Sequence, residues 1–160
     1  MVNVLYAPFF NATRDVFKLM LDLNNISDKP LSNKDVPTLN GRIDIAIGII
    51  GDLQGKVIYY FPKETSLEMV KIMSGMEFSE IDDFVTSALG EIANIISGNV
   101  MSTLSVQKIS CDILPPHILD KTEDKADSDY KFYSGMQICT DIGNIDLDIM
   151  LNTAPVKEYR

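Results

Sequence analysis

Apolar side chains recur at helical spacing near the start of the chain, up to about residue 21. Pro8 suits the first turn of a helix, because the N–H that proline lacks has no intrahelical partner there. Asn24 and Asn25 end the pattern. The sequence therefore predicts a helix that begins near Pro8, with these apolar positions: Phe9, Phe10, Val16, Phe17, Met20 and Leu21. Residues 27–41 contain prolines and polar residues and predict a connection with room for one short strand.

Two β-branched, apolar runs then predict a hairpin, with strands over residues 42–50 and 56–61. Between them, residues 51–55 form a predicted turn with a glycine at either end. The run from residue 43 to residue 50 is almost continuously apolar, which is typical of a strand covered on both faces. Pro62 ends the second strand.

Two further helices follow. Residues 63–75 have Leu67, Val70 and Met73 on one side and end at a glycine. Residues 79–82, Ser-Glu-Ile-Asp, resemble an N-terminal cap and open a third helix, which is predicted to run to about Leu104.

The rest of the chain predicts strands over residues 106–114, 130–140 and 144–151, with a solvated acidic loop over residues 120–129. The order helix, strands, two helices, strands indicates an α+β fold, with long helices packed on a mainly antiparallel sheet. The 160 residues form one predicted domain, residues 1–160.

The composition of the chain argues against several classes of function. The chain has 14 Lys and Arg against 23 Asp and Glu, a net charge of −9, so it is a poor nucleic-acid binder. Its apolar runs are too short for a membrane span, and its first thirteen residues lack the basic region of a signal peptide. Two cysteines and one histidine cannot form the usual structural zinc sites. We therefore expect a cytoplasmic protein without a metal or cofactor of its own.

The third helix carries the most informative pattern. At about 100° per residue, its apolar side chains form one arc that must face the core. A narrow polar stripe lies opposite: Ser87, Glu91, Asn94, Gly98 and Ser102. Such a stripe is typical of any amphipathic surface helix. Two glycines, Gly90 and Gly98, lower the stability of a helix interior, which a plain solvent-exposed face would not require. Together with Ser97 they give this face small side chains that let another backbone approach closely. A docking face is therefore the second interpretation.

The segment Ser87-Ala-Leu-Gly-Glu91-Ile-Ala-Asn94 resembles the motif of the CheC/CheX/FliY family of chemotaxis phosphatases. Most of the chain shares the resemblance: the first helix, the glycine-flanked hairpin, and the strand and proline loop at residues 111–116. Members of the CheC type carry Glu-x-x-Asn on two helices. The first helix here has Asn11-Ala-Thr-Arg-Asp15 and no such element, so the chain is similar to the CheX type.

The resemblance implies hydrolysis of an aspartyl phosphate on a CheY-type response regulator. Asn94 would orient the water and Glu91 would clamp the regulator's active-site lysine, while Ser87 and Gly98 would support partner binding. Mg²⁺ would come with the regulator. The resemblance also implies a homodimer joined through sheet edges.

Two alternatives stay open: a module that binds the regulator without turnover, and a structural dimerisation domain. Exposure of Glu91 and Asn94 together favours the enzyme, whereas internal pairing of either favours the structural domain.

Overall fold

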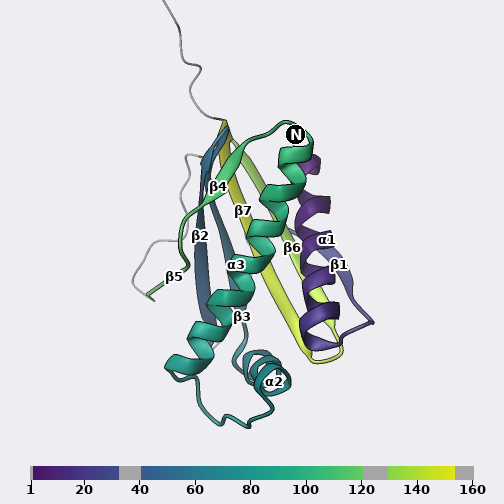
Figure 1. The fold of residues 1–160 in the computed structure, drawn as a ribbon, viewed down its shortest axis with the longest axis vertical. Helices are drawn as coiled ribbons and strands as arrows, with labels where there is room; N and C mark the ends of the chain where they lie inside the picture. Colours follow the sequence, from purple (N-terminus) through teal and green to yellow (C-terminus); the bar gives the residue numbers. More distant parts are fainter. Residues whose placement is uncertain (1, 33–40, 121–129, 154–160) are drawn as a thin grey trace, which may run out of the picture.

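The computed structural model describes residues 2–32, 41–120 and 130–153, with side chains from residue 5 onward. Within these residues, helices cover one face of a seven-stranded antiparallel sheet (Figure 1). The strand order is β1-β6-β7-β3-β2-β4, and β5 also pairs with β2. The elements are α1 Val2–Leu21, β1 Ser27–Leu31, β2 Ile43–Gly51, β3 Leu53–Phe61, α2 Lys63–Ser74, α3 Asp83–Val106, β4 Cys111–Ile113, β5 His117–Ile118, β6 Phe132–Thr140 and β7 Gly143–Thr153. The α+β fold with a mainly antiparallel sheet is confirmed.

The first helix begins earlier than predicted. It starts at Val2, so Pro8 lies inside α1 rather than in its first turn. Proline in a helix interior removes one backbone hydrogen bond. The helix continues across it because Leu5 and Phe9, on either side of the proline, are both buried in the core.

The predicted hairpin is confirmed, but both strands extend into the predicted turn. The β2–β3 ladder ends at the pair Ile49 and Gly55. Beyond it, Gly51 pairs with Cys111 on β4, and Leu53 pairs with Thr153 on β7. The outer strands thus order residues that the local sequence marks as a turn. Gly55 is required there, because its φ is +157° and a Cβ would lie 2.0 Å from the Met150 carbonyl oxygen.

The second helix ends as predicted, with Gly75 in the left-handed conformation and its N–H bonded to the Lys71 carbonyl. The third helix begins later than the Ser79 cap predicts. Asp82 is the N-cap, and its Oδ1 accepts the Val85 N–H at 2.9 Å. This hydrogen bond fixes where α3 begins.

The strand predicted over residues 106–114 is mostly wrong. Helix α3 continues to Val106, and only Cys111–Ile113 pair with β2. The strands β6 and β7 are confirmed, and most of the predicted loop over residues 120–129 lies outside the described residues. Strand β7 is central, between β6 and β3, so its apolar side chains are not left on an open edge.

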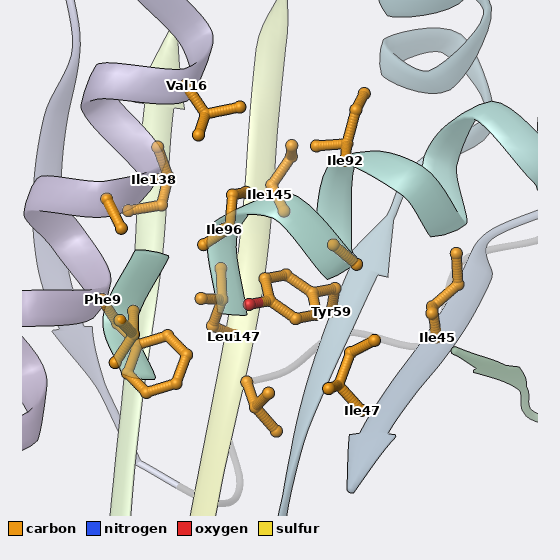
Figure 2. Packing of buried hydrophobic residues seen from close by; sticks show 14 of the residues in the cluster. Phe9, Val16, Ile45, Ile47, Tyr59, Ile92, Ile96, Ile138, Ile145 and Leu147 are labelled. Atoms are coloured by element: carbon orange, nitrogen blue, oxygen red, sulfur yellow. The ribbon is translucent and has the colours of Figure 1, made fainter. Parts of the chain in front are cut away.

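The main core lies between the helices and the sheet. Figure 2 shows Tyr59 of β3 among residues of α1, α3 and β7, with Phe9, Ile96 and Leu147 around it. The Tyr59 hydroxyl is fully buried and lies 2.7 Å from the Ser97 hydroxyl of α3. This pair joins α3 to the middle of the sheet and so positions the helix.

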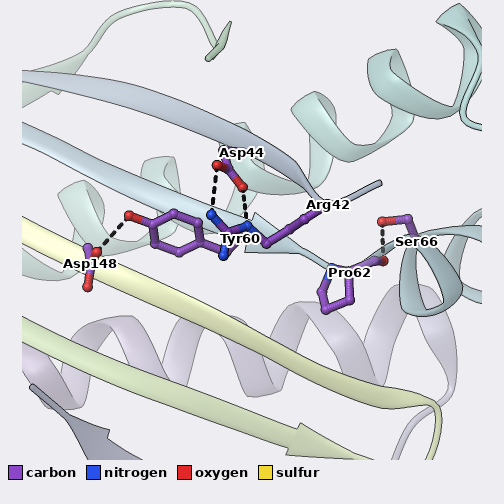
Figure 3. Close-up of polar contacts among 6 residues, drawn as sticks. All are labelled: Arg42, Asp44, Tyr60, Pro62, Ser66 and Asp148. Atoms are coloured by element: carbon purple, nitrogen blue, oxygen red, sulfur yellow. Dashed lines mark hydrogen bonds and ion pairs between the residues drawn. The ribbon is translucent and has the colours of Figure 1, made fainter. Parts of the chain in front are cut away.

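The opposite face of the sheet holds a smaller core and a buried polar network. Arg42 donates from Nε and Nη2 to the two carboxylate oxygens of Asp44, at 2.7 and 3.1 Å (Figure 3). The Tyr60 hydroxyl donates to Asp148 at 2.7 Å, and the Arg42 guanidinium lies 4.6 Å from the Tyr60 ring centroid. Strand β2 is therefore covered on both faces over most of its length, as its apolar run predicts.

Among the described residues, no helix is long and apolar enough to cross a membrane. Cys111 and Cys139 are both free and half-buried.

Candidate functional site

The polar stripe on α3 forms an open ridge on the helix layer. Ser87 and Glu91 are exposed, and Asn94 and Gly98 are half-buried. Residues three and four apart on a helix are neighbours, so these side chains follow one another along a single face. The opposite side of α3 is buried as predicted, with Val85, Leu89, Ile92, Ala93, Ile96 and Val100 in the core.

Glu91 and Asn94 are available to a partner. Within the part of the chain that the structure describes, neither side chain makes a hydrogen bond or an ion pair. An internal pairing of either residue is what a purely structural role of this face requires, and the described contacts contain none. A carboxylate and an amide one turn apart can together accept from a cation and hold a water molecule.

The two glycines of the face have different surroundings. A Cβ at Gly90 would lie 3.5 Å from the Pro116 ring, an ordinary contact, so the proline loop after β4 borders the site on this side. A Cβ at Gly98 would meet no atom within 4 Å. Nothing within the described residues therefore demands a glycine at position 98.

Two grooves flank the C-terminal half of α3, from Gly98 onward. One, of about 410 Å³, lies between α3 and β4 and is lined by Gly98, Met101, Ser102, Ser105, Cys111, Asp112 and Ile113. The other, of about 440 Å³, lies between α3 and α1 and is lined by residues that include Asn11, Asp15, Asn99 and Ser102. Both hollows therefore lie beside the C-terminal half of α3, beyond Glu91 and Asn94.

The structure corrects one part of the sequence interpretation. Ser97 is not one of the small side chains on the outer face, because it points into the core and pairs with Tyr59. Burial raises the pKa of the Tyr59 hydroxyl, which stays protonated. Asn99, the second asparagine of α3 after Asn94, is exposed, but it lines the groove beside α1.

Phe84 joins this face unexpectedly. It is half-exposed and precedes Ser87 and Glu91 by three and seven residues, which places it on the same side of α3. The sequence contains this spacing, but the prediction of the face rests on polar residues and leaves an aromatic one out.

In the described residues, no group of three or more His, Cys, Asp or Glu side chains is placed to hold a metal ion.

Comparison with known proteins identifies the family. The model of the family described as chemotaxis phosphatase CheX matches residues 43–138. A protein of Thermotoga maritima, named CheY-P phosphatase CheX, is 31% identical over 119 residues, which are 74% of this chain and 74% of that protein. The chain belongs to the CheX family of chemotaxis phosphatases.

Solved CheX structures share the fold. The chemotaxis protein CheX of Vibrio vulnificus has a TM-score of 0.79 at 22% identity, covering 92% of this chain and 99% of its own. The CheX of Borrelia burgdorferi, crystallised as a CheX–CheY–BeF3–Mg²⁺ complex, has a TM-score of 0.77 at 24% identity and covers 92% of this chain and 97% of its own. The resemblance found in the sequence is confirmed, and as a CheX family member the protein is a phosphatase.

Proposed function

We propose that this protein dephosphorylates the aspartyl phosphate of a CheY-type response regulator, with Asn94 orienting the water and Glu91 binding the regulator's active site. The CheX relative of Thermotoga maritima is named for CheY-P, and the CheX of Borrelia burgdorferi forms a complex with CheY, BeF3 and Mg²⁺. The observation that carries the proposal is the pair Glu91 and Asn94, one turn apart on an open helix face and without internal partners among the described residues.

The reaction needs little chemistry from the phosphatase. Water attacks the phosphorus, the bond between phosphorus and the aspartyl oxygen breaks, and the products are a free carboxylate and inorganic phosphate, with the water's proton passing to the phosphate or solvent. The acyl phosphate is already reactive, so positioning of the water in line with the breaking bond is the main requirement. The Asn94 carbonyl can accept from this water while its NH2 donates nearby.

Glu91 supplies the clamp. A carboxylate can pair with a lysine in the regulator's phosphorylation site and thereby hold Asn94 over the phosphoryl group. Mg²⁺ belongs to the regulator in this proposal. The net charge of −9 does not oppose binding, because the phosphoryl group stays within the partner beside its own cations.

Ser87 and Gly98 support the same contact. Ser87 is exposed one turn before Glu91, and the open space above Gly98 lets a partner backbone approach the helix. We also propose a homodimer joined through sheet edges, which in this fold are β1 on one side and β4 with β5 on the other. Sedimentation of the purified protein tests this dimer.

The test of the catalytic proposal is the decay of a Mg²⁺-bound, phosphorylated CheY-type regulator from the same genome. We expect wild type to accelerate the decay and Asn94→Ala to lose about 100-fold of that acceleration while it still binds. Asn99→Ala is the matched control, because it removes an exposed asparagine from the same helix but not from the site.

The outcomes separate the two remaining functions. If the wild-type protein binds the regulator but does not accelerate its dephosphorylation, the protein is a regulator-binding module and not an enzyme. If Asn94→Ala and Asn99→Ala lose the same amount of acceleration, Asn94 does not orient the water.

A further inference from the structure

Phe84 is an aromatic side chain held in a fixed position at the surface. It lies in the first turn of α3 and is 50% exposed. Its ring stacks on Phe78, with centroids 5.3 Å apart and planes at 12°. Phe78 is half-buried and packs against the main core. The stack therefore orients the Phe84 ring without burying it, so docking of a partner on it costs little side-chain entropy.

The ring lies within reach of any partner bound at the proposed site. Phe84 precedes Glu91 by seven residues and Asn94 by ten, so at about 1.5 Å per residue it lies about 10 and 15 Å away along α3. A partner that buries about 800 Å² on this side covers a disc of about 16 Å radius. A regulator centred between Glu91 and Asn94, with an interface of this size, reaches Phe84 as well.

The charges around Phe84 indicate the chemistry of the surface that meets it. Asp82 and Asp83 directly precede it, and Glu80 lies four residues before it; all three are exposed. Acidic side chains that precede an exposed aromatic ring on the same surface complement an apolar depression edged by Lys or Arg. Aromatic side chains, phenylalanine included, are enriched in protein interfaces and bury a large apolar area there.

We propose that Phe84 is the apolar anchor that sets the affinity of this phosphatase for its response regulator, inserting into an apolar depression with a basic edge beside the regulator's phosphorylation site. The proposal rests on the proposed function, since it takes the regulator as the partner. It assigns affinity to Phe84, while orientation of the water stays with Asn94. Phe84 thus contributes to binding and takes no part in the chemical step.

The test is a binding titration with the beryllofluoride-activated, Mg²⁺-bound regulator, together with steady-state kinetics on the phosphorylated form. We expect Phe84→Ala to raise Kd and KM by about tenfold or more, with kcat unchanged. Phe84→Leu, which keeps most of the apolar surface, should recover most of the affinity. Ile50→Ala is the matched control, because Ile50 is 46% exposed and its place in β2 puts it on the side of the sheet away from the helices.

Each outcome decides between the two proposals. A Kd for Phe84→Ala equal to that of Ile50→Ala overturns the anchor, even if Asn94→Ala abolishes turnover. A wild-type protein that binds the activated regulator through Phe84 but does not accelerate decay supports the anchor and ends the catalytic proposal. Absence of any binding by the wild-type protein overturns both. Unchanged thermal unfolding of Phe84→Ala establishes that a loss of affinity is local.

Discussion

The hydroxyls of Tyr59 and Ser97 lie 2.7 Å apart where the central strand β3 meets α3. Both side chains are fully buried. Ser97 is three residues after Asn94 and on the inner side of the helix, so this contact, together with the apolar residues of α3, holds the helix on the sheet with Glu91 facing outward.

Ser97→Ala should destabilise the protein. It leaves the buried Tyr59 hydroxyl without its partner, at a cost of about 1–3 kcal/mol in the free energy of unfolding. Urea unfolding measures this. The double variant Tyr59→Phe, Ser97→Ala should recover part of the loss, because both polar groups are then gone. A double variant no more stable than Ser97→Ala would show that packing, not the hydrogen bond, sets the cost.

Gly98→Ala should separate stability from function. The added methyl meets no atom within 4 Å, so the helix gains about 0.5–1 kcal/mol in the free energy of unfolding. The same methyl occupies the surface that the regulator approaches, and dephosphorylation should slow. Thr103→Ala, on the far side of α3 from Asn94, gives a comparable helix gain and should leave turnover unchanged. Full activity in Gly98→Ala would place the regulator elsewhere.

Arg42→Met should strongly destabilise the sheet. The Arg42 and Asp44 side chains are only 10% and 8% exposed and form a two-point ion pair. Removal of the guanidinium takes the Arg42 counter-charge away from a buried carboxylate, at a cost of about 3 kcal/mol. Thermal and urea unfolding at neutral pH measure it. The double variant Arg42→Met, Asp44→Leu should regain most of the loss, and a further decrease instead would contradict the ion-pair explanation.

The protein should lose part of its stability as the pH rises through the pKa of Asp146. Burial raises the pKa of this carboxyl above its ordinary 3.8, and the Asp148 carboxylate adds to the effect, against the Gln137 hydrogen bond and the Arg42 and Lys29 charges. The folded state then binds more protons than the unfolded state in the interval between the two pKa values. Stability from this group is present at low pH and decreases as the carboxyl ionises.

Asp146→Asn tests this pH dependence directly. The amide keeps an oxygen for the Gln137 donor and carries no charge, so the variant should be more stable than wild type at neutral pH. Urea unfolding between about pH 4 and pH 7 should show a shallower fall than in wild type. Asp141→Asn, at an exposed turn between β6 and β7, controls for the loss of one negative charge. A variant less stable than wild type across this range would reverse the assignment.

Local pattern was enough for the elements that have strong boundaries. Gly75 ends α2 because it adopts the left-handed conformation, and the apolar period of α3 selects its buried face. Local pattern was insufficient where contacts with a segment far away in the sequence determine the boundary of an element. The residues around Gly51 pair with β4 and β7, and α1 extends through Pro8 because Leu5 and Phe9 pack into the core. The residues near Gly51 and Pro8 in the sequence do not show which distant segments they will contact.

The sequence by itself determined the relation between Glu91 and Asn94, because the geometry of a helix places residues three apart on one face whatever surrounds it. It also carried the family resemblance that the comparisons confirm. Only the tertiary structure decided that this face stays open, with Ser97 directed inward to Tyr59 and Phe84 held outward by Phe78. These directions depend on contacts between segments far apart in the chain, and burial and pairing of that kind are properties of the folded whole.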